Sequence, residues 1–141
     1  MPRGRDTGRA MSQEYVERVR RGFERFAETG DVAGPGLHPD FEVFDHDIPD
    51  ARNPYRGAAG FNEWISEFGA AWDRWELEIE RLIDAGDRVV SLFRMRAVGA
   101  GSGAVVERSD GIVWTFRDDK LFRVDYFNDQ DDALEAAGLR E

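Results

Sequence analysis

The acidic triplet Asp45-His46-Asp47 is the first group of residues whose types and spacing suit chemistry. It falls at the end of an expected strand over about residues 41–48, along which successive side chains point to opposite faces. Asp45 and Asp47 therefore share a face with apolar residues, and His46 points the other way. Two carboxylates at an apolar wall can accept a proton and hold a water molecule. An acidic strand end in solvent is the alternative, which the sequence leaves open.

The second group combines arginines with a carboxylate. Arg94 and Arg96 lie two residues apart on one expected strand, and Arg123 and Asp125 lie two apart on another. The members of each pair therefore project from the same face. If the pairs meet in a pocket, a guanidinium would keep Asp125 ionised, and the fixed carboxylate could orient and activate water. A solvated, charged face of an antiparallel sheet is the alternative.

Aromatic residues at helix and strand periods form the third group. Stripes of this kind usually pack in a core or form a pocket wall, and a subset could floor a ligand cavity. From the three groups we predict Asp45, Asp125 and Arg94 as catalytic residues. The predicted substrate-binding residues are Asp47, Arg96, His46, Trp64, Phe68, Trp114 and Tyr126.

Metal and cofactor chemistry have no support in the sequence. The two histidines, His38 and His46, do not stand at metal-ligand spacing, and the chain has no cysteine. No glycine-rich phosphate-binding motif occurs either. We therefore predict no metal and no cofactor.

The composition bounds the class of protein. In 141 residues, 29 acidic side chains outnumber 19 basic ones, and the net charge of −10 disfavours nucleic acid and anionic membrane surfaces as partners. The longest apolar runs fall far short of the roughly 20 residues that span a bilayer. We expect a cytoplasmic protein with a frayed tail over residues 1–11 and a single domain over residues 12–141.

Hydrophobic periodicity predicts the elements that would position these groups. A period near 3.6 indicates two amphipathic helices in the first half, and a period of two then indicates strands joined by short turns. The expected helices cover about residues 12–30, 58–73 and 130–137, and the strands after the second helix about 75–84, 88–98, 104–117 and 121–128. Helices followed by a run of strands predict an α+β fold with an antiparallel meander. Because the strands are apolar on both faces, one face could cover the helices and the other a second copy of the chain.

Four short segments in this order resemble the nuclear-transport-factor-2-like superfamily, and within it the SnoaL-like (polyketide-cyclase-like) proteins. The segments are Glu28-Thr29-Gly30-Asp31, Tyr55-Arg56-Gly57, residues 82–90 and Arg123-Val124-Asp125-Tyr126-Phe127-Asn128. The resemblance covers roughly residues 12–140. It implies a cone-shaped α+β barrel of cystatin-like type, in which a curved antiparallel sheet wraps around N-terminal helices. It also implies a largely apolar pocket and frequent dimers.

Two branches of the superfamily offer sharper comparisons. Asp45 is similar in position to the proton-shuttling Asp of ketosteroid isomerases, but Phe23 stands where their oxyanion-hole Tyr is expected. Asp125 and Arg94 resemble members of the Asp-Arg-Asp set of limonene-epoxide hydrolases, but Arg96 replaces the acid that protonates the epoxide. Loss of a general acid typically removes about 10²–10⁴-fold of rate, which argues against that route.

We therefore predict a small-molecule pocket protein of SnoaL-like type that binds a hydrophobic or aromatic metabolite. Cyclase- or isomerase-like acid–base catalysis by Asp45 and Asp125 stays open, so the sequence does not decide whether the protein is an enzyme. The alternatives are epoxide-hydrolase-like water activation and a non-catalytic ligand-binding or dimerisation module. The expected partners are the small molecule and a second copy of the chain, paired through the sheet.

Overall fold

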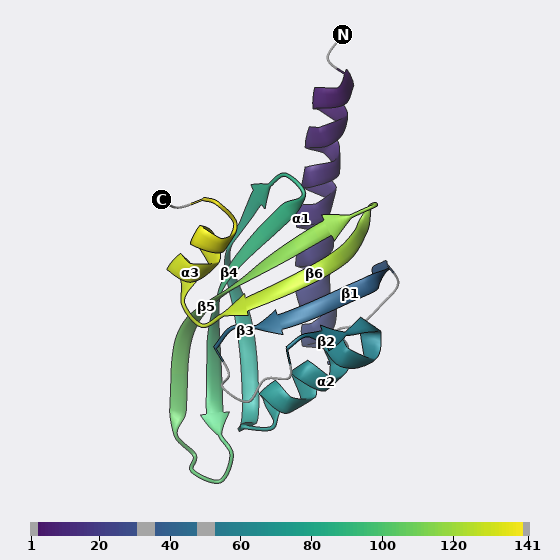
Figure 1. Ribbon diagram of the computed structural model, residues 1–141. Coiled ribbons are helices and arrows are strands. Elements are labelled where there is room, and N and C mark those ends of the chain that lie inside the picture. The colour runs from purple at the N-terminus through teal and green to yellow at the C-terminus, as the bar shows by residue number, and fades with distance from the viewer. Residues whose placement is uncertain (1–2, 31–35, 48–52, 140–141) are drawn as a thin grey trace.

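The computed structural model describes residues 3–30, 36–47 and 53–139, with side chains from Gln13 onward. Helix α1 spans Arg3–Thr29, and Gly30 ends it with a positive φ of 74° and an N–H bonded to the carbonyl of Phe26. The sequence predicts that this helix begins at Ser12, whereas residues 3–11 are helical as well, in place of the expected tail. Extending an existing helix costs far less than nucleating one, so the lack of an apolar period does not end it. Figure 1 shows this N-terminal part of α1 projecting beyond the sheet.

The remaining elements follow the predicted order, with one additional strand of two residues, Tyr55–Arg56, before the second helix. Helix α2 comes one residue earlier than expected and is shorter, and the first strand begins four residues earlier. Ile48, the last residue of that expected strand, lies outside the described residues. The elements are β1 Leu37–Asp45, β2 Tyr55–Arg56, α2 Gly57–Gly69, β3 Trp72–Ala85, β4 Arg88–Gly99, β5 Val105–Arg117, β6 Lys120–Phe127 and α3 Gln130–Ala136.

The strands form one six-stranded sheet in the order β2-β1-β6-β5-β4-β3. The antiparallel meander predicted for β3 to β6 is confirmed by the register of its three pairs. Strand β1 lies parallel to β6, with Phe44 opposite Asp125 and Asp45 opposite Tyr126. This pairing brings the acidic end of β1 next to the last strand, although about 80 residues separate them in the chain.

Helices cover the inner face of the sheet and part of its outer face. The inner face packs against α1 and α2 through a core that includes Phe41, Phe61 and Phe93. The outer face packs against α3 through Leu92 and Ala133, among others. The predicted α+β fold, with N-terminal helices inside a curved sheet, is confirmed (Figure 1).

Candidate functional site

A cavity of about 350 Å³ lies between helices α1 and α2 and the inner face of the sheet. Phe23 and Phe26 of α1 line one side, and α2 contributes Phe61, Trp64 and Phe68. The sheet supplies most of the rest. Its lining residues are Leu37, Trp75, Leu77, Phe93, Ile112, Trp114, Phe116, Leu121 and Tyr126. Because ligand sites in proteins usually measure about 300–1,000 Å³ and are mostly apolar, this cavity has the size and lining of a site for a small ligand.

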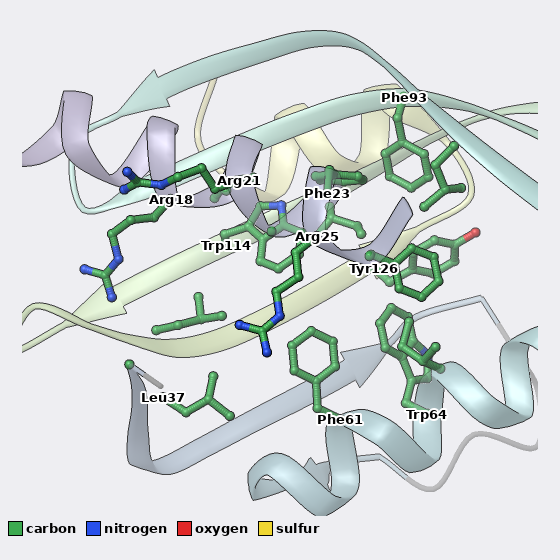
Figure 2. A pocket seen from close by; sticks show the side chains of 18 of the residues that line it. Arg18, Arg21, Phe23, Arg25, Leu37, Phe61, Trp64, Phe93, Trp114 and Tyr126 are labelled. Carbon is green, nitrogen blue, oxygen red and sulfur yellow. The ribbon is translucent and has the colours of Figure 1, made fainter. Parts of the chain in front are cut away.

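Aromatic contacts fix the walls of the cavity. Trp64 and Phe68 each meet the ring of Tyr126 edge-on, with ring centroids 5.6 and 5.5 Å apart. Phe23 meets Trp114 in the same manner at 5.8 Å, which ties α1 to the sheet. The structure therefore brings together four of the predicted substrate-binding residues, Trp64, Phe68, Trp114 and Tyr126, around one space. Figure 2 shows three of them, Trp64, Trp114 and Tyr126.

Behind Tyr126 lies a buried polar network that the sequence analysis did not single out. Asp110 is 0% exposed and accepts hydrogen bonds from Arg108 Nε at 2.8 Å, Arg108 Nη2 at 3.1 Å and the Tyr126 hydroxyl. Arg108 Nη2 also donates to that hydroxyl at 2.9 Å. Burial, and then the charge of Asp110, raise the pKa of Tyr126 well above its usual range. Burial lowers the pKa of Arg108, but its bonds and charge interactions with Asp110 and Tyr126 outweigh burial, so the net change is upward.

The alternation of side chains along β5 is a sequence pattern from which this network could have been predicted. Arg108 and Asp110 have the same parity as Ile112, Trp114 and Phe116, which are apolar and point inward. A charged pair at the end of such a stripe is expected to be buried with a partner, because unpaired buried charges are costly.

Asp45 is buried on the inner face but lies behind the cavity wall. Its Oδ2 accepts the indole Nε1–H of Trp64 at 2.8 Å, and its Oδ1 accepts the backbone N–H of Asp47 at 3.0 Å. The Asp47 carboxylate accepts the backbone N–H of Asn128 at 2.6 Å. Neither carboxylate lines the cavity. Asp45 thus reaches that space only through Trp64, whose ring it orients.

Asp125 lies on the outer face, because its neighbours Val124 and Tyr126 belong to the inner core. Arg123 donates to it from Nε at 2.8 Å and from Nη2 at 2.9 Å, and His46 Nε2 lies 2.8 Å from its Oδ1. The hydrogen bond to Asp125 raises the pKa of Arg123. His46 stacks on the ring of Phe127. The predicted pairing of Arg123 with Asp125 is present, but it lies outside the cavity.

Arg94 and Arg96 do not meet Asp125. Both project from the outer face of β4, with side chains 54% and 60% exposed, and lie 3.6 Å from Glu80 and 3.7 Å from Glu107. The expected convergence of Arg94 and Asp125 in one apolar pocket is therefore wrong. The reason is parity: Phe93 and Met95 occupy the inner face of β4, so the arginines between and after them point outward. A homodimer through the sheet stays a prediction, and Val105 and Leu139 are the exposed large hydrophobic residues of the described chain.

Within residues 3–30, 36–47 and 53–139, no three His, Cys, Asp or Glu side chains gather in a way that could hold a metal ion. In the same part of the chain, no helix is long and apolar enough to cross a membrane.

Comparison with known proteins agrees with this architecture. A solved structure of TerC co-crystallised with polyporic acid matches with 21% identity over 87% of this chain and 97% of that one, at a TM-score of 0.68. A putative SnoaL-like polyketide cyclase from Jannaschia sp. CCS1 matches with 22% identity over 89% and 92%, at a TM-score of 0.67. An NTF2-like protein of unknown function from Burkholderia pseudomallei matches with 18% identity over 88% and 95%, at a TM-score of 0.69.

These likenesses, all under 25% identity, establish the fold. No curated protein matches the chain by sequence. The family model of the SnoaL-like domain matches residues 16–124, which is most of the chain and includes α2, five of the strands and most of the sixth. The chain therefore belongs to the SnoaL-like domain family.

Proposed function

We propose that this protein binds a hydrophobic or aromatic small molecule in the cavity beneath α1 and α2. One observation carries the proposal: a space of about 350 Å³ is lined mainly by aromatic and other apolar side chains from both helices and the sheet. Burial of apolar ligand surface against such walls is the main driving force for binding at sites of this kind. The solved structure of TerC with polyporic acid supports the proposal by analogy, since that protein shares the fold.

The geometry supports binding over acid–base catalysis at this cavity. A general acid or base must come within hydrogen-bond reach of the proton that it transfers, or within one water of it. Asp45 and Asp125 do not line the cavity, and each carboxylate is already engaged by other groups of the protein. We assign ligand contact to Trp64, Phe68, Trp114 and Tyr126, and a positioning role to Asp45 through Trp64.

Intrinsic fluorescence provides a direct test. Three of the four tryptophans of the chain, Trp64, Trp75 and Trp114, line the cavity, so a bound ligand should change their emission. We expect aromatic probes of two and three fused rings to quench this emission saturably, with a stoichiometry of one per chain by calorimetry. An absence of saturable binding across this panel would contradict the proposal.

Gly22 supplies a matched pair of variants. It lines the cavity from α1, and a Cβ atom built on it meets no heavy atom within 4 Å. Gly22→Phe starts from an unobstructed Cβ position and should place its ring in the cavity, so we expect it to abolish probe binding while circular dichroism shows an intact fold. Gly22→Ala adds a single methyl group and should leave binding intact. Equal binding by both variants would show that the probes occupy another site.

Asp125→Asn distinguishes binding at the cavity from the predicted acid–base chemistry. Because Asp125 lies on the outer face beneath Arg123 and His46, we expect unchanged probe affinity in this variant. A large loss of affinity, with the fold intact by circular dichroism, would show that Asp125 contributes to the binding site.

A further inference from the structure

Among the residues that the structure describes, the charged side chains that line the cavity are Arg18, Arg21 and Arg25 of α1, and no Asp or Glu belongs to that lining. Arg18 also forms an ion pair with Asp119 at 3.4 Å. The chain as a whole has the opposite bias, with 29 acidic residues against 19 basic ones. The opening therefore has a local excess of positive charge on an acidic protein, which favours the approach of an anion.

The three arginines project from α1 beside the aromatic lining (Figure 2). Residues 18, 21 and 25 are spaced by three and four positions, so they share one face of the helix. Arg18 is fixed at one end of this row, because its Nη1 donates to the carbonyl of Asp119 at 3.0 Å and its guanidinium lies 5.1 Å from the ring centroid of Phe116. In Figure 2 the side chain of Arg25 extends toward Phe61 at the other end.

Arg21 is the most informative of the three. Its side chain makes no hydrogen bond or ion pair with any residue that the structure describes, and the residue is exposed at the cavity. Arg18 has a structural role through Asp119 and Phe116, and Arg25 also interacts with other groups of the protein. Neither explanation applies to Arg21, which lies between them on the same face of α1.

We propose that the cavity takes an amphipathic anion, with an apolar or aromatic body and one carboxylate or ionised hydroxyl group. The aromatic walls hold the body, and the arginine row on α1 holds the anionic group near the opening. A guanidinium presents paired donors that match the two oxygens of a carboxylate, and charge-assisted bonds of this kind are about twice as strong as neutral ones. This inference rests on the proposed function, because it assigns a ligand class to the same cavity.

The test uses three probes with one aromatic body and different charges. The probes are 2-naphthoate, its neutral analogue naphthalene-2-methanol and its cationic analogue 2-naphthylmethylammonium, titrated at neutral pH. We expect the anion to bind about three- to tenfold tighter than the alcohol, the range for partly exposed charge-assisted pairs, and the cation to bind weakest. Raising the salt from about 0.05 M to about 0.5 M should reduce the preference for the anion, because screening weakens exposed charge interactions.

Substitutions on α1 test which arginine causes the preference for the anionic probe. Arg21→Gln should remove most of the preference for the anion while leaving the affinity for the alcohol unchanged. Arg20→Gln makes the same charge change on the same helix, but Arg20 pairs with Glu17 and does not line the cavity, so it should have no effect.

The outcomes separate the inference from the function on which it rests. If the alcohol binds as tightly as the anion, or if Arg20→Gln and Arg21→Gln act alike, the anionic class is wrong while the apolar pocket stands. If none of the three probes binds the wild-type protein and Gly22→Phe changes nothing, the proposed function fails, and the ligand class fails with it.

Discussion

Removal of the Asp110 carboxylate should cost far more stability than removal of the Asp125 carboxylate. Each of these residues pairs with the arginine two positions earlier on its own strand. Asp110 is 0% exposed and holds Arg108 through two bonds and the Tyr126 hydroxyl through a third. Asp110→Ala would leave the guanidinium and the hydroxyl without their acceptor. Breaking a buried pair costs about 3–5 kcal/mol, and the 31% exposure of Arg108 places this case near about 3 kcal/mol.

Asp125→Ala is the matched comparison on the outer face. Arg123 has a side chain that is 41% exposed, so water can replace the lost carboxylate. His46, the other partner of this buried carboxylate, is 37% exposed, so we expect a cost of only about 1 kcal/mol. The difference of about 2 kcal/mol corresponds to roughly a thirtyfold difference in the folding equilibrium constant.

Urea unfolding followed by circular dichroism and by tryptophan emission measures both variants, provided that the two signals coincide and the m-value is unchanged. If Asp110→Ala costs no more than Asp125→Ala, the inner network does not carry the stability that its burial implies. The assignment of inner and outer faces to these two pairs would then need revision.

Three further changes probe the scaffold. Gly111→Ala should destabilise the protein by about 1–3 kcal/mol, because its Cβ would lie 2.6 Å from that of Ala133, and Gly111→Ala/Ala133→Gly should recover part of the loss in urea titrations. Asp129→Ala should cost about 1 kcal/mol by the same assay, since its carboxylate caps α3. The raised pKa of Tyr126 means that, above about pH 10, the unfolded chain loses this proton first, so the free energy of unfolding should fall by up to about 1.4 kcal/mol per pH unit. Tyr126→Phe should show a shallower alkaline decline, and an equally steep one would contradict the raised pKa.

The elements and their order could be predicted because each depends on local periodicity. The aromatic residues of α2 recur at helical spacing, and β3 to β6 alternate between short turns. Trp64, Phe68, Trp114 and Tyr126 line one cavity because large aromatic residues pack inward wherever a core exists, and their contact with a ligand stays a prediction.

Local periodicity could not show which face of each strand points toward the helices and the cavity. A period of two tells which residues share a face of β4, but both parities are apolar because α3 covers part of the outer face through Val90 and Leu92. Nothing local therefore shows that Phe93 points inward and Arg94 outward. Asp110 was missed for the opposite reason, since its charge favours a solvent position until its partners Arg108 and Tyr126 are known.

The position of Asp125 depends on a long-range pairing. Strand β1 lies parallel to β6, and this register sets His46 beside Asp125 and Asp47 beside Asn128. Parallel neighbours far apart in sequence leave no turn signal that would reveal them. Asp45 and Asp47 were candidates for the pocket wall, with a solvated strand end as the alternative. In the structure the Asp45 carboxylate instead contacts the indole N–H of Trp64, and His46 and Asp47 help to join β1 to the end of β6.

A crystal structure of the protein with a bound aromatic probe tests the central claim most directly. We expect the ring system of 2-naphthoate to lie between Trp64, Phe68 and Trp114, with its carboxylate toward Arg21, and the sheet unchanged. A probe bound instead beside Arg94 and Arg96 on the outer face, with the cavity vacant, would contradict the claim that this space is the binding site.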